Sequence, residues 1–250
     1  MEIATEKSPM FLSILRGNVL ARRGVAKCAI LSMLSVVSCK TASDTRTPTP
    51  LFPGEGIPVG FVVRHWADVK DPPKEPTAWE VKDGVLLGGV PRGSWLLSER
   101  EYGDFRLAFE FRLGERGNSG LALRTPLAGD PAFDGIELQL ADSRYNPEAT
   151  PAELTGGIYR AIAPKAQVYR PCEWNRLEVE AIGPRLRAWL NDELIQDVDL
   201  DRATADVQRH DGTPAVPLAR RPRRGHLGFQ ELSRDGARVE IRNALITALD

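Results

Sequence analysis

The sequence predicts an all-β protein, an antiparallel sandwich of two β-sheets with a concanavalin-like jelly-roll arrangement, over residues 61–250. Short segments with alternating apolar and polar residues follow one another closely along this region, as antiparallel strands do. Gly, Pro, Asn and Asp separate these segments, which is typical of the turns in sandwiches and barrels. No long stretch has the 3.6-residue apolar period of an amphipathic helix.

The segment that precedes the domain is expected to be a lipoprotein signal peptide, residues 1–38. Basic residues precede an apolar run at 28–38, which is shorter than the roughly 20 residues that a membrane-spanning helix needs. The run ends in Val-Val-Ser-Cys, which resembles the lipobox of bacterial lipoproteins. We therefore expect a lipid on Cys39 and an exported protein anchored to the cell envelope, in the periplasm or at the outer membrane. An ordinary secretory signal is the alternative.

Residues 39–60 are rich in Thr, Pro and Gly, which predicts an extended, semi-rigid linker. The body beyond it contains one cysteine, Cys172, so no disulfide can form within it. The formal net charge of −1 gives no electrostatic reason to expect nucleic acid as a partner. The basic stretch 219–224 is interpreted as an exposed loop. The membrane is expected to be contacted only through the N-terminal lipid.

Turn residues and the alternation of apolar and polar residues predict the individual strands. A hairpin is expected at 79–87, because Asp83-Gly84 is typical of a tight turn. Between Phe105 and Leu113 every second residue is apolar, which predicts a half-buried strand with Phe109 and Phe111 in the core. Further strands are predicted at 120–124, 135–141, 156–160, 175–182, 185–190, 193–199, 226–231 and 237–249.

The same alternation separates core residues from residues on an open face. Glu137 and Gln139 lie between apolar residues that should face the core, so the two are expected to share the open face. Across the predicted strands the open-face side chains are charged, amide or aromatic: Arg124, Glu137, Gln139, Tyr159, Trp189 and Gln230. Such a set suits a sugar, since polar groups bind its hydroxyls and rings stack on its apolar face. The outer face of any antiparallel sheet is polar, however, so parity alone does not distinguish a sugar site from a solvated surface.

A series of short motifs runs in order through residues 66–249. It comprises Trp79, Asp83-Gly84-Val85-Leu86, Tyr102-Gly103-Asp104-Phe105, Asn118-Ser119-Gly120, Glu137-Leu138-Gln139, Asp142, Thr155-Gly156-Gly157-Ile158-Tyr159, Glu173-Trp174-Asn175, Leu190-Asn191, Gly225-His226-Leu227-Gly228-Phe229-Gln230 and Ile241-Arg242-Asn243. This series resembles the 3-keto-disaccharide hydrolase family. The resemblance implies two curved sheets with a site on the concave face, and cleavage of glycosides oxidised to a ketone at C3. It carries the site over to Asn118, Glu137, Gln139 and Tyr159.

The sequence departs from that family after Asp142, where many members have a His and this chain has Ser143-Arg144-Tyr145. The departure weakens any implication of a metal or of a second acid–base group. His65, His210 and His226 are widely separated in sequence and do not form a zinc motif. A divalent metal ion held by oxygens of Glu137 and Asp142 stays an open alternative, and the sequence does not identify a cofactor.

The resemblance implies a route in which a base removes the hydrogen on C2, the enolate expels the group on C1, and water adds back. On this hypothesis Glu137 is the base, Arg124 stabilises the enolate, and Tyr159 or Asp142 assists the leaving group. The alternative for Glu137 is a structural ion pair with Arg124. The residues expected to bind substrate are Asn118, Gln139, Trp189 and Gln230.

Two other functions remain open at this stage. The same sandwich serves carbohydrate-binding lectins without catalysis, and it also serves interaction modules of the cell surface. A deep pocket with clustered carboxylates would favour an enzyme, a shallow groove with aromatic platforms a lectin, and a flat apolar patch an interaction module.

Overall fold

The computed structural model of the chain describes residues 46–250. The predicted signal peptide and Cys39 lie outside the described residues. Within residues 46–250, no helix has both the length and the apolar character needed to cross a membrane.

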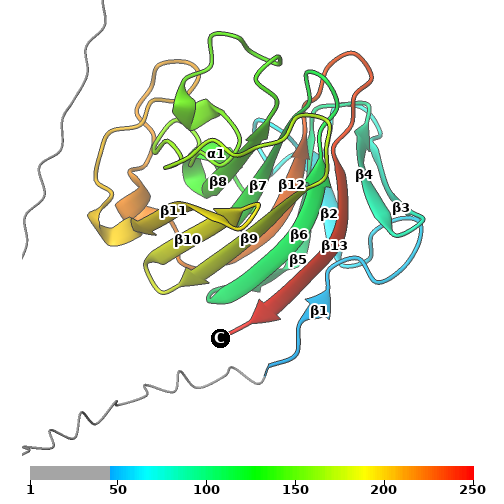
Figure 1. Cartoon of the computed structure of the whole chain (residues 1–250), viewed down its shortest axis with the longest axis horizontal. Coiled ribbons are helices and arrows are strands. Elements are labelled where there is room, and N and C mark those ends of the chain that lie inside the picture. The colour runs from blue at the N-terminus through cyan, green and yellow to red at the C-terminus, as the bar shows by residue number, and fades with distance from the viewer. Residues whose placement is uncertain (1–45) are drawn as a thin grey trace, which may run out of the picture. The chain divides into compact units, whose positions relative to one another are not determined.

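The described residues form a sandwich of two antiparallel sheets, as the sequence predicts (Figure 1). The larger sheet has the spatial order β11 (Glu193–Asp199), β10 (Arg185–Leu190), β9 (Asn175–Ile182), β6 (Phe105–Arg112), β13 (Glu240–Ala248), β4 (Val85–Val90) and β3 (Ala78–Lys82), with β1 (Thr49–Pro50) also paired to β13. The smaller sheet has the order β2 (Phe61–His65), β5 (Ser94–Tyr102), β12 (Gly225–Glu231), β7 (Asn118–Thr125) and β8 (Ile136–Ala141). Helical structure is limited to α1 (Pro131–Asp134) and the short 3₁₀ turns η1 (Pro151–Glu153), η2 (Leu200–Arg202) and η3 (Leu218–Arg220).

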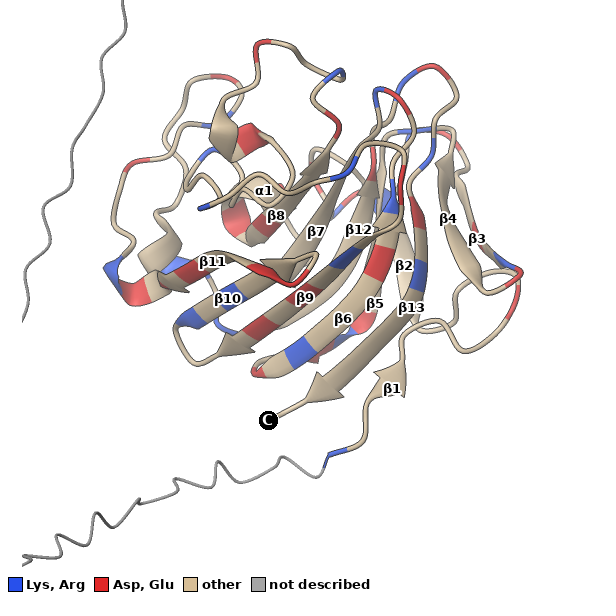
Figure 2. Ribbon diagram, viewed as in Figure 1, with Lys and Arg blue, Asp and Glu red and all other residues tan. Residues whose placement is uncertain are grey.

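The core lies between the two sheets and is built by the predicted alternation. Phe109 and Phe111 of β6 are buried there, while Glu110 between them faces outward and its carboxylate accepts a hydrogen bond from Arg242 at 2.6 Å. Bands of charged residues cross β6, β9 and β10 and one end of β13 (Figure 2). Many of them form ion pairs across neighbouring strands, such as Arg106 with Glu180 at 2.9 Å.

Most of the predicted strands are present. The hairpin turn at Asp83-Gly84 joins β3 to β4, with Lys82 opposite Val85. The segment 156–160, predicted as a strand, is instead a loop with a single bridge from Ile158 to Leu138. Strand β5 was not predicted, because Trp95, Leu96 and Leu97 are all apolar and all buried, so the segment has no alternation to detect.

The linker prediction is wrong for residues 49–60, which are part of the domain. Thr49 and Pro50 pair with β13, and Leu51 is buried in the core. Gly56 exchanges two backbone hydrogen bonds with Val81, and the Glu55 carboxylate accepts from the backbone of the β3–β4 turn. The apolar residues in this Pro-rich segment therefore secure it to the edge of the sandwich.

Candidate active site

A pocket of about 570 Å³ opens on the outer face of the smaller sheet. Strands β7, β8 and β12 supply its floor through Asn118, Glu137, Gln139 and Gln230. Loops on both sides supply the walls, which include Trp66, Arg92, Asp130, Tyr145, Asn146, Glu153, Tyr159, Arg160 and His210. Strand parity thus placed Glu137, Gln139 and Gln230 in the pocket floor. Asn118 and Tyr159, which the family resemblance indicated, line the same pocket, Tyr159 from a loop and not from the predicted strand.

The floor of the pocket is recessed because small residues of β7 lie opposite polar residues of β8. Gly120 of β7 lies opposite Gln139 of β8, and Ala122 lies opposite Glu137. The Glu137 carboxyl group occupies the space that a side chain at position 120 would need. A glycine at this position therefore lets the carboxyl group lie flat across the neighbouring strand.

Glu137 is 3% exposed and has no ion-pair partner within 4 Å among residues 46–250. Burial raises the pKa of its carboxyl group well above the ordinary value, and the negative charge of Asp130 raises this pKa further. A buried carboxyl group without a cation keeps its proton near neutral pH. The structure therefore contradicts the alternative in which Glu137 is paired with Arg124.

The amide side chains of the floor have free hydrogen-bonding capacity. The Asn118 Oδ1 atom is buried and has no hydrogen-bond partner, whereas Gln139 Oε1 accepts from the backbone N–H of Leu140 at 3.0 Å. A buried acceptor without a donor is uncommon and costs free energy. Asn118 Oδ1 is therefore positioned to accept a hydrogen bond from a hydroxyl group of a bound ligand.

The wall contains a second carboxyl group, Asp130, which the sequence analysis did not identify. Its Oδ1 atom accepts from the backbone N–H of Ala132 at 3.0 Å and so caps α1. Burial raises the pKa of Asp130 to about 6. The Asp-Pro pair at 130–131 is a recognisable helix start, but nothing local to it indicates that α1 would stand beside β8.

Two rings line the same wall. Tyr159 and His210 have ring centroids 5.8 Å apart, and both pack against Phe133. Burial raises the pKa of the Tyr159 hydroxyl, so the group stays protonated and can donate. Burial lowers the pKa of His210, which favours its neutral form.

Arg124, predicted on the open face, is not part of the pocket wall. Its guanidinium group is buried and donates to Gly103 O at 2.8 Å, Gly183 O at 2.7 Å and Asp104 Oδ1 at 3.1 Å. The β7–β12 register shifts next to this residue, and Arg124 has a left-handed backbone with φ of 51°. This β-bulge breaks the alternation on which the prediction depended.

Trp189 is also misplaced by the prediction. It lies on β10 in the larger sheet, where the Arg187 guanidinium stands 5.6 Å from the centroid of its ring. Its neighbours in a separate groove belong to β6, β9 and β13, on the opposite side of the sandwich from Glu137. Alternation identifies the face of a strand but not the sheet to which the strand belongs.

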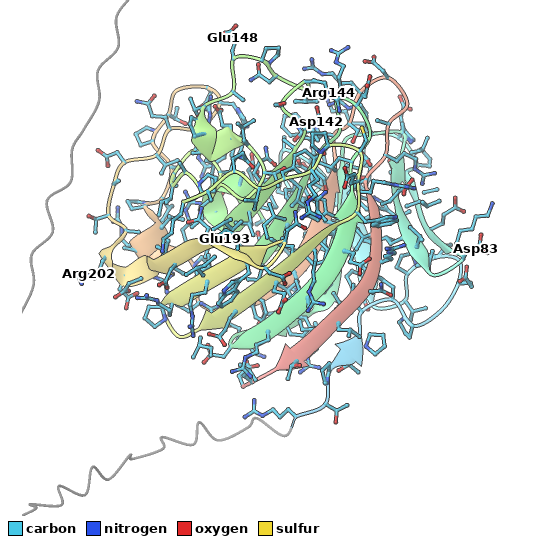
Figure 3. All side chains as sticks on the ribbon, in the orientation of Figure 1. Asp83, Asp142, Arg144, Glu148, Glu193 and Arg202 are labelled. Atoms are coloured by element: carbon cyan, nitrogen blue, oxygen red, sulfur yellow. The ribbon has the colours of Figure 1, made fainter. Side chains whose placement is uncertain are left out.

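Asp142 follows β8 and lies beside the pocket rather than in its wall. It lines a smaller cavity of about 50 Å³ that shares Asn118 and Gln139 with the pocket. Arg144 binds both carboxylate oxygens, at 2.7 and 2.8 Å, and the two residues are close together in Figure 3. Burial alone would raise the pKa of Asp142, but the hydrogen bonds from Arg144 outweigh it and lower this pKa.

The described part of the chain does not bring together a set of side chains that could form a metal centre. Among residues 46–250, no group of three or more His, Cys, Asp or Glu side chains converges in a way that could hold an ion. Asp142 is committed to Arg144, so it does not join Glu137 as a pair of oxygen ligands.

The fold and the pocket together define an antiparallel β-sandwich with a carboxyl-bearing pocket on its smaller sheet. The chain belongs to the family of 3-keto-alpha-glucoside-1,2-lyase-like domains, whose model matches residues 47–247. This confirms the resemblance found in the sequence.

Solved structures with a similar fold include two candidate glycosyl hydrolases from Parabacteroides distasonis ATCC 8503. The first is 24% identical with a TM-score of 0.67, over 81% of this chain and 100% of that chain. The second is 23% identical with a TM-score of 0.61, over 81% of this chain and 94% of that chain. No protein with a curated description matches this sequence.

Proposed function

We propose that this protein is a carbohydrate-active enzyme that cleaves glycosides bearing a ketone at C3, by elimination followed by hydration. The observation that carries the proposal is the buried, unpaired carboxyl group of Glu137 among three amide side chains in a pocket of about 570 Å³. Membership of a 1,2-lyase-like family supports an elimination step. The net result of elimination and hydration is hydrolysis of the glycosidic bond.

The route needs three things from the pocket: removal of the C2 proton, stabilisation of the enolate oxygen, and a proton for the leaving oxygen. Glu137 is proposed to carry one of the two proton transfers. Arg92 and Arg160 are guanidinium groups in the wall and could stabilise the enolate in place of Arg124. Asn118, Gln139 and Gln230 are proposed to bind sugar hydroxyls, and Tyr159 to donate a hydrogen bond.

A lectin function is the alternative that the sequence left open. Three carboxyl groups line the pocket, those of Asp130, Glu137 and Glu153, and such clustering favours proton transfer over simple sugar binding. Trp189, the ring that the sequence proposed as a lectin's stacking platform, lies on the other sheet.

The proposal is tested by incubating the purified protein with 3-keto disaccharides, with and without a chelator, and measuring release of the free sugars. Glu137→Gln should lower turnover by about 10²–10⁴-fold, the usual contribution of a proton-transfer group. The matched control is Glu178→Gln, a Glu on the outer face of the larger sheet that pairs with Arg176, and it should retain the parent rate. Binding without turnover by the parent protein would support the lectin instead. A chelator that abolishes turnover would establish dependence on a metal.

We also propose that the protein is exported and lipidated at Cys39, on the sequence pattern alone. Cys39→Ala should move the protein from the membrane fraction to the soluble fraction of cells. Cys28→Ala, a cysteine within the apolar run, is the control and should leave fractionation unchanged. If Cys39→Ala remains as membrane-bound as the parent, the lipid assignment is wrong.

A further inference from the structure

On the hypothesis drawn from the sequence, Glu137 is the base and Asp130 has no role. We infer that Asp130 is the base that removes the C2 proton and that Glu137 is the acid that protonates the leaving oxygen. The inference rests on the function proposed above, and it reverses the earlier role of Glu137.

The surroundings of Glu137 favour its neutral form. The carboxyl group lies over Gly120, beside Ala122, on a floor strand where it is 3% exposed. Among residues 46–250 it has no cation within 4 Å and no N–H donor within hydrogen-bonding distance. Ionising a buried carboxyl group without such partners is costly. The group therefore enters the reaction with a proton to donate.

Asp130, unlike Glu137, has neighbours that stabilise its carboxylate form. The Ala132 N–H donates to Oδ1 at 3.0 Å. The positive charges of Arg209 and Arg221 favour the ionised carboxylate, whereas the negative charge of Asp134 disfavours it. Burial still raises the pKa of Asp130, to about 6, which is a suitable value for a base that acts near neutral pH.

The third carboxyl group of the wall, Glu153, is already committed. It accepts from Arg160 Nε at 2.8 Å and from the backbone N–H of Thr150 at 3.0 Å. Glu137 and Asp130 are thus the two acids lining this pocket that lack an ion-pair partner within 4 Å in the described part of the chain. Among residues 46–250 Glu137 has no donor or cation, whereas Asp130 accepts from a backbone N–H and is favoured as a carboxylate by Arg209 and Arg221. Two carboxyl groups in such different environments are the usual basis for an acid–base division of roles.

The division accounts for every proton in the proposed reaction. Asp130 takes the proton from C2, and the electrons of that C–H bond form the enolate with the C3 oxygen. The enolate collapses to a C1=C2 double bond, the bond from C1 to the leaving oxygen breaks, and Glu137 gives its proton to that oxygen. In hydration, Glu137 takes a proton from water, the hydroxyl group bonds to C1, and Asp130 returns its proton to C2. Both residues then have their starting protonation.

The test separates proton removal from cleavage. A 3-keto-1,5-anhydroglucitol has no leaving group at C1, so an active base exchanges its C2 hydrogen for deuterium in D₂O without any elimination. Asp130→Asn should lower the enzyme-catalysed exchange by at least about 10²-fold, whereas Glu137→Gln should keep it within a few-fold of the parent. Asn is also a good helix cap, so Asp130→Asn should keep α1. The control is Asp199→Asn, which changes a residue that caps η2 and does not line the pocket.

Leaving-group dependence provides the second measurement. Methyl 3-keto-glucoside needs an acid because methanol leaves poorly, whereas 4-nitrophenyl 3-keto-glucoside does not. Glu137→Gln should lose about 10²-fold or more in activity on the methyl substrate and little on the nitrophenyl one, and Asp130→Asn should lose activity on both.

If Glu137→Gln abolishes exchange and Asp130→Asn retains it, our assignment is overturned while the proposed function stands. A parent protein that neither exchanges nor cleaves any of these substrates would refute the proposed function itself.

Discussion

The carboxyl group of Glu137 lies directly over Gly120, in the space where any other residue would have its Cβ atom. The two residues belong to paired strands, β8 and β7, with Gly120 opposite Gln139. A glycine on one strand therefore determines where the carboxyl group on the next strand can lie. This relationship links the Asn-Ser-Gly and Glu-Leu-Gln motifs, which are separated in the sequence.

Gly120→Ala should reduce activity far more than stability. A Cβ at position 120 would overlap Glu137 Oε1 and lie 2.7 Å from Cδ, so the flexible carboxyl end must move. We expect turnover of 3-keto glycosides to fall by about 10²-fold, because small displacements of a reacting group are costly. The free energy of unfolding should change by less than about 2 kcal/mol. Gly54→Ala, where no atom lies within 4 Å of an added Cβ, is the control. Equal activity in both variants would contradict this account.

Asn118→Leu should weaken substrate binding without destabilising the fold. The Asn118 Oδ1 atom is buried and has no partner, so the substitution removes an unsatisfied acceptor. We expect KM to rise about tenfold, which corresponds to about 1.4 kcal/mol. Asn175→Leu is a contrasting variant, since that side chain bonds Arg170, Glu173 and Asn191 and should lose about 3 kcal/mol of stability instead. Comparing thermal unfolding and KM for the two variants checks the prediction.

Local alternation predicts strands and the side chains that one strand presents, because it depends only on neighbouring residues. It therefore located β6 and placed Glu137 and Gln139 on one face of β8. It missed β5, in which Trp95, Leu96 and Leu97 are all buried.

The errors at the site have a different origin. Trp189 was assigned to the wrong sheet because sheet membership depends on pairing between distant segments. Arg124 lies within a bulge, and Asp130 lies on a loop whose place beside β8 depends on tertiary packing. The floor of the pocket could thus be predicted from the sequence, whereas of the wall residues Tyr159 alone was named as a site residue, through the family resemblance.

Arg124→Met should destabilise the fold and leave the chemistry intact. The buried guanidinium group donates to Gly103, Gly183 and Asp104, and removing it leaves these acceptors without their donor. We expect a loss of about 3–5 kcal/mol in the free energy of unfolding, as when one partner of a buried pair is removed. Turnover per folded molecule should stay close to that of the parent. Normal stability combined with lost turnover would restore the catalytic role that the sequence suggested.

Asp130→Asn should make the protein more stable at neutral pH while it loses activity. Burial raises the pKa of Asp130 from 3.8 to about 6 in the folded protein, so the folded state binds this proton more tightly than the unfolded state does. Stability from this group is therefore fully present below about pH 4 and is lost as pH rises towards 6. The loss is at most about 3 kcal/mol, the free-energy equivalent of that shift.

Asn does not titrate, and it keeps the cap on α1. The difference in unfolding free energy between Asp130→Asn and the parent should therefore grow in favour of the variant between pH 4 and 6 and level off above pH 7. Urea unfolding at several pH values measures this difference directly. A difference that is constant across that range would show that Asp130 is not held at a raised pKa. The base that we infer for this pocket would then lack the environment that suits it to act near neutral pH.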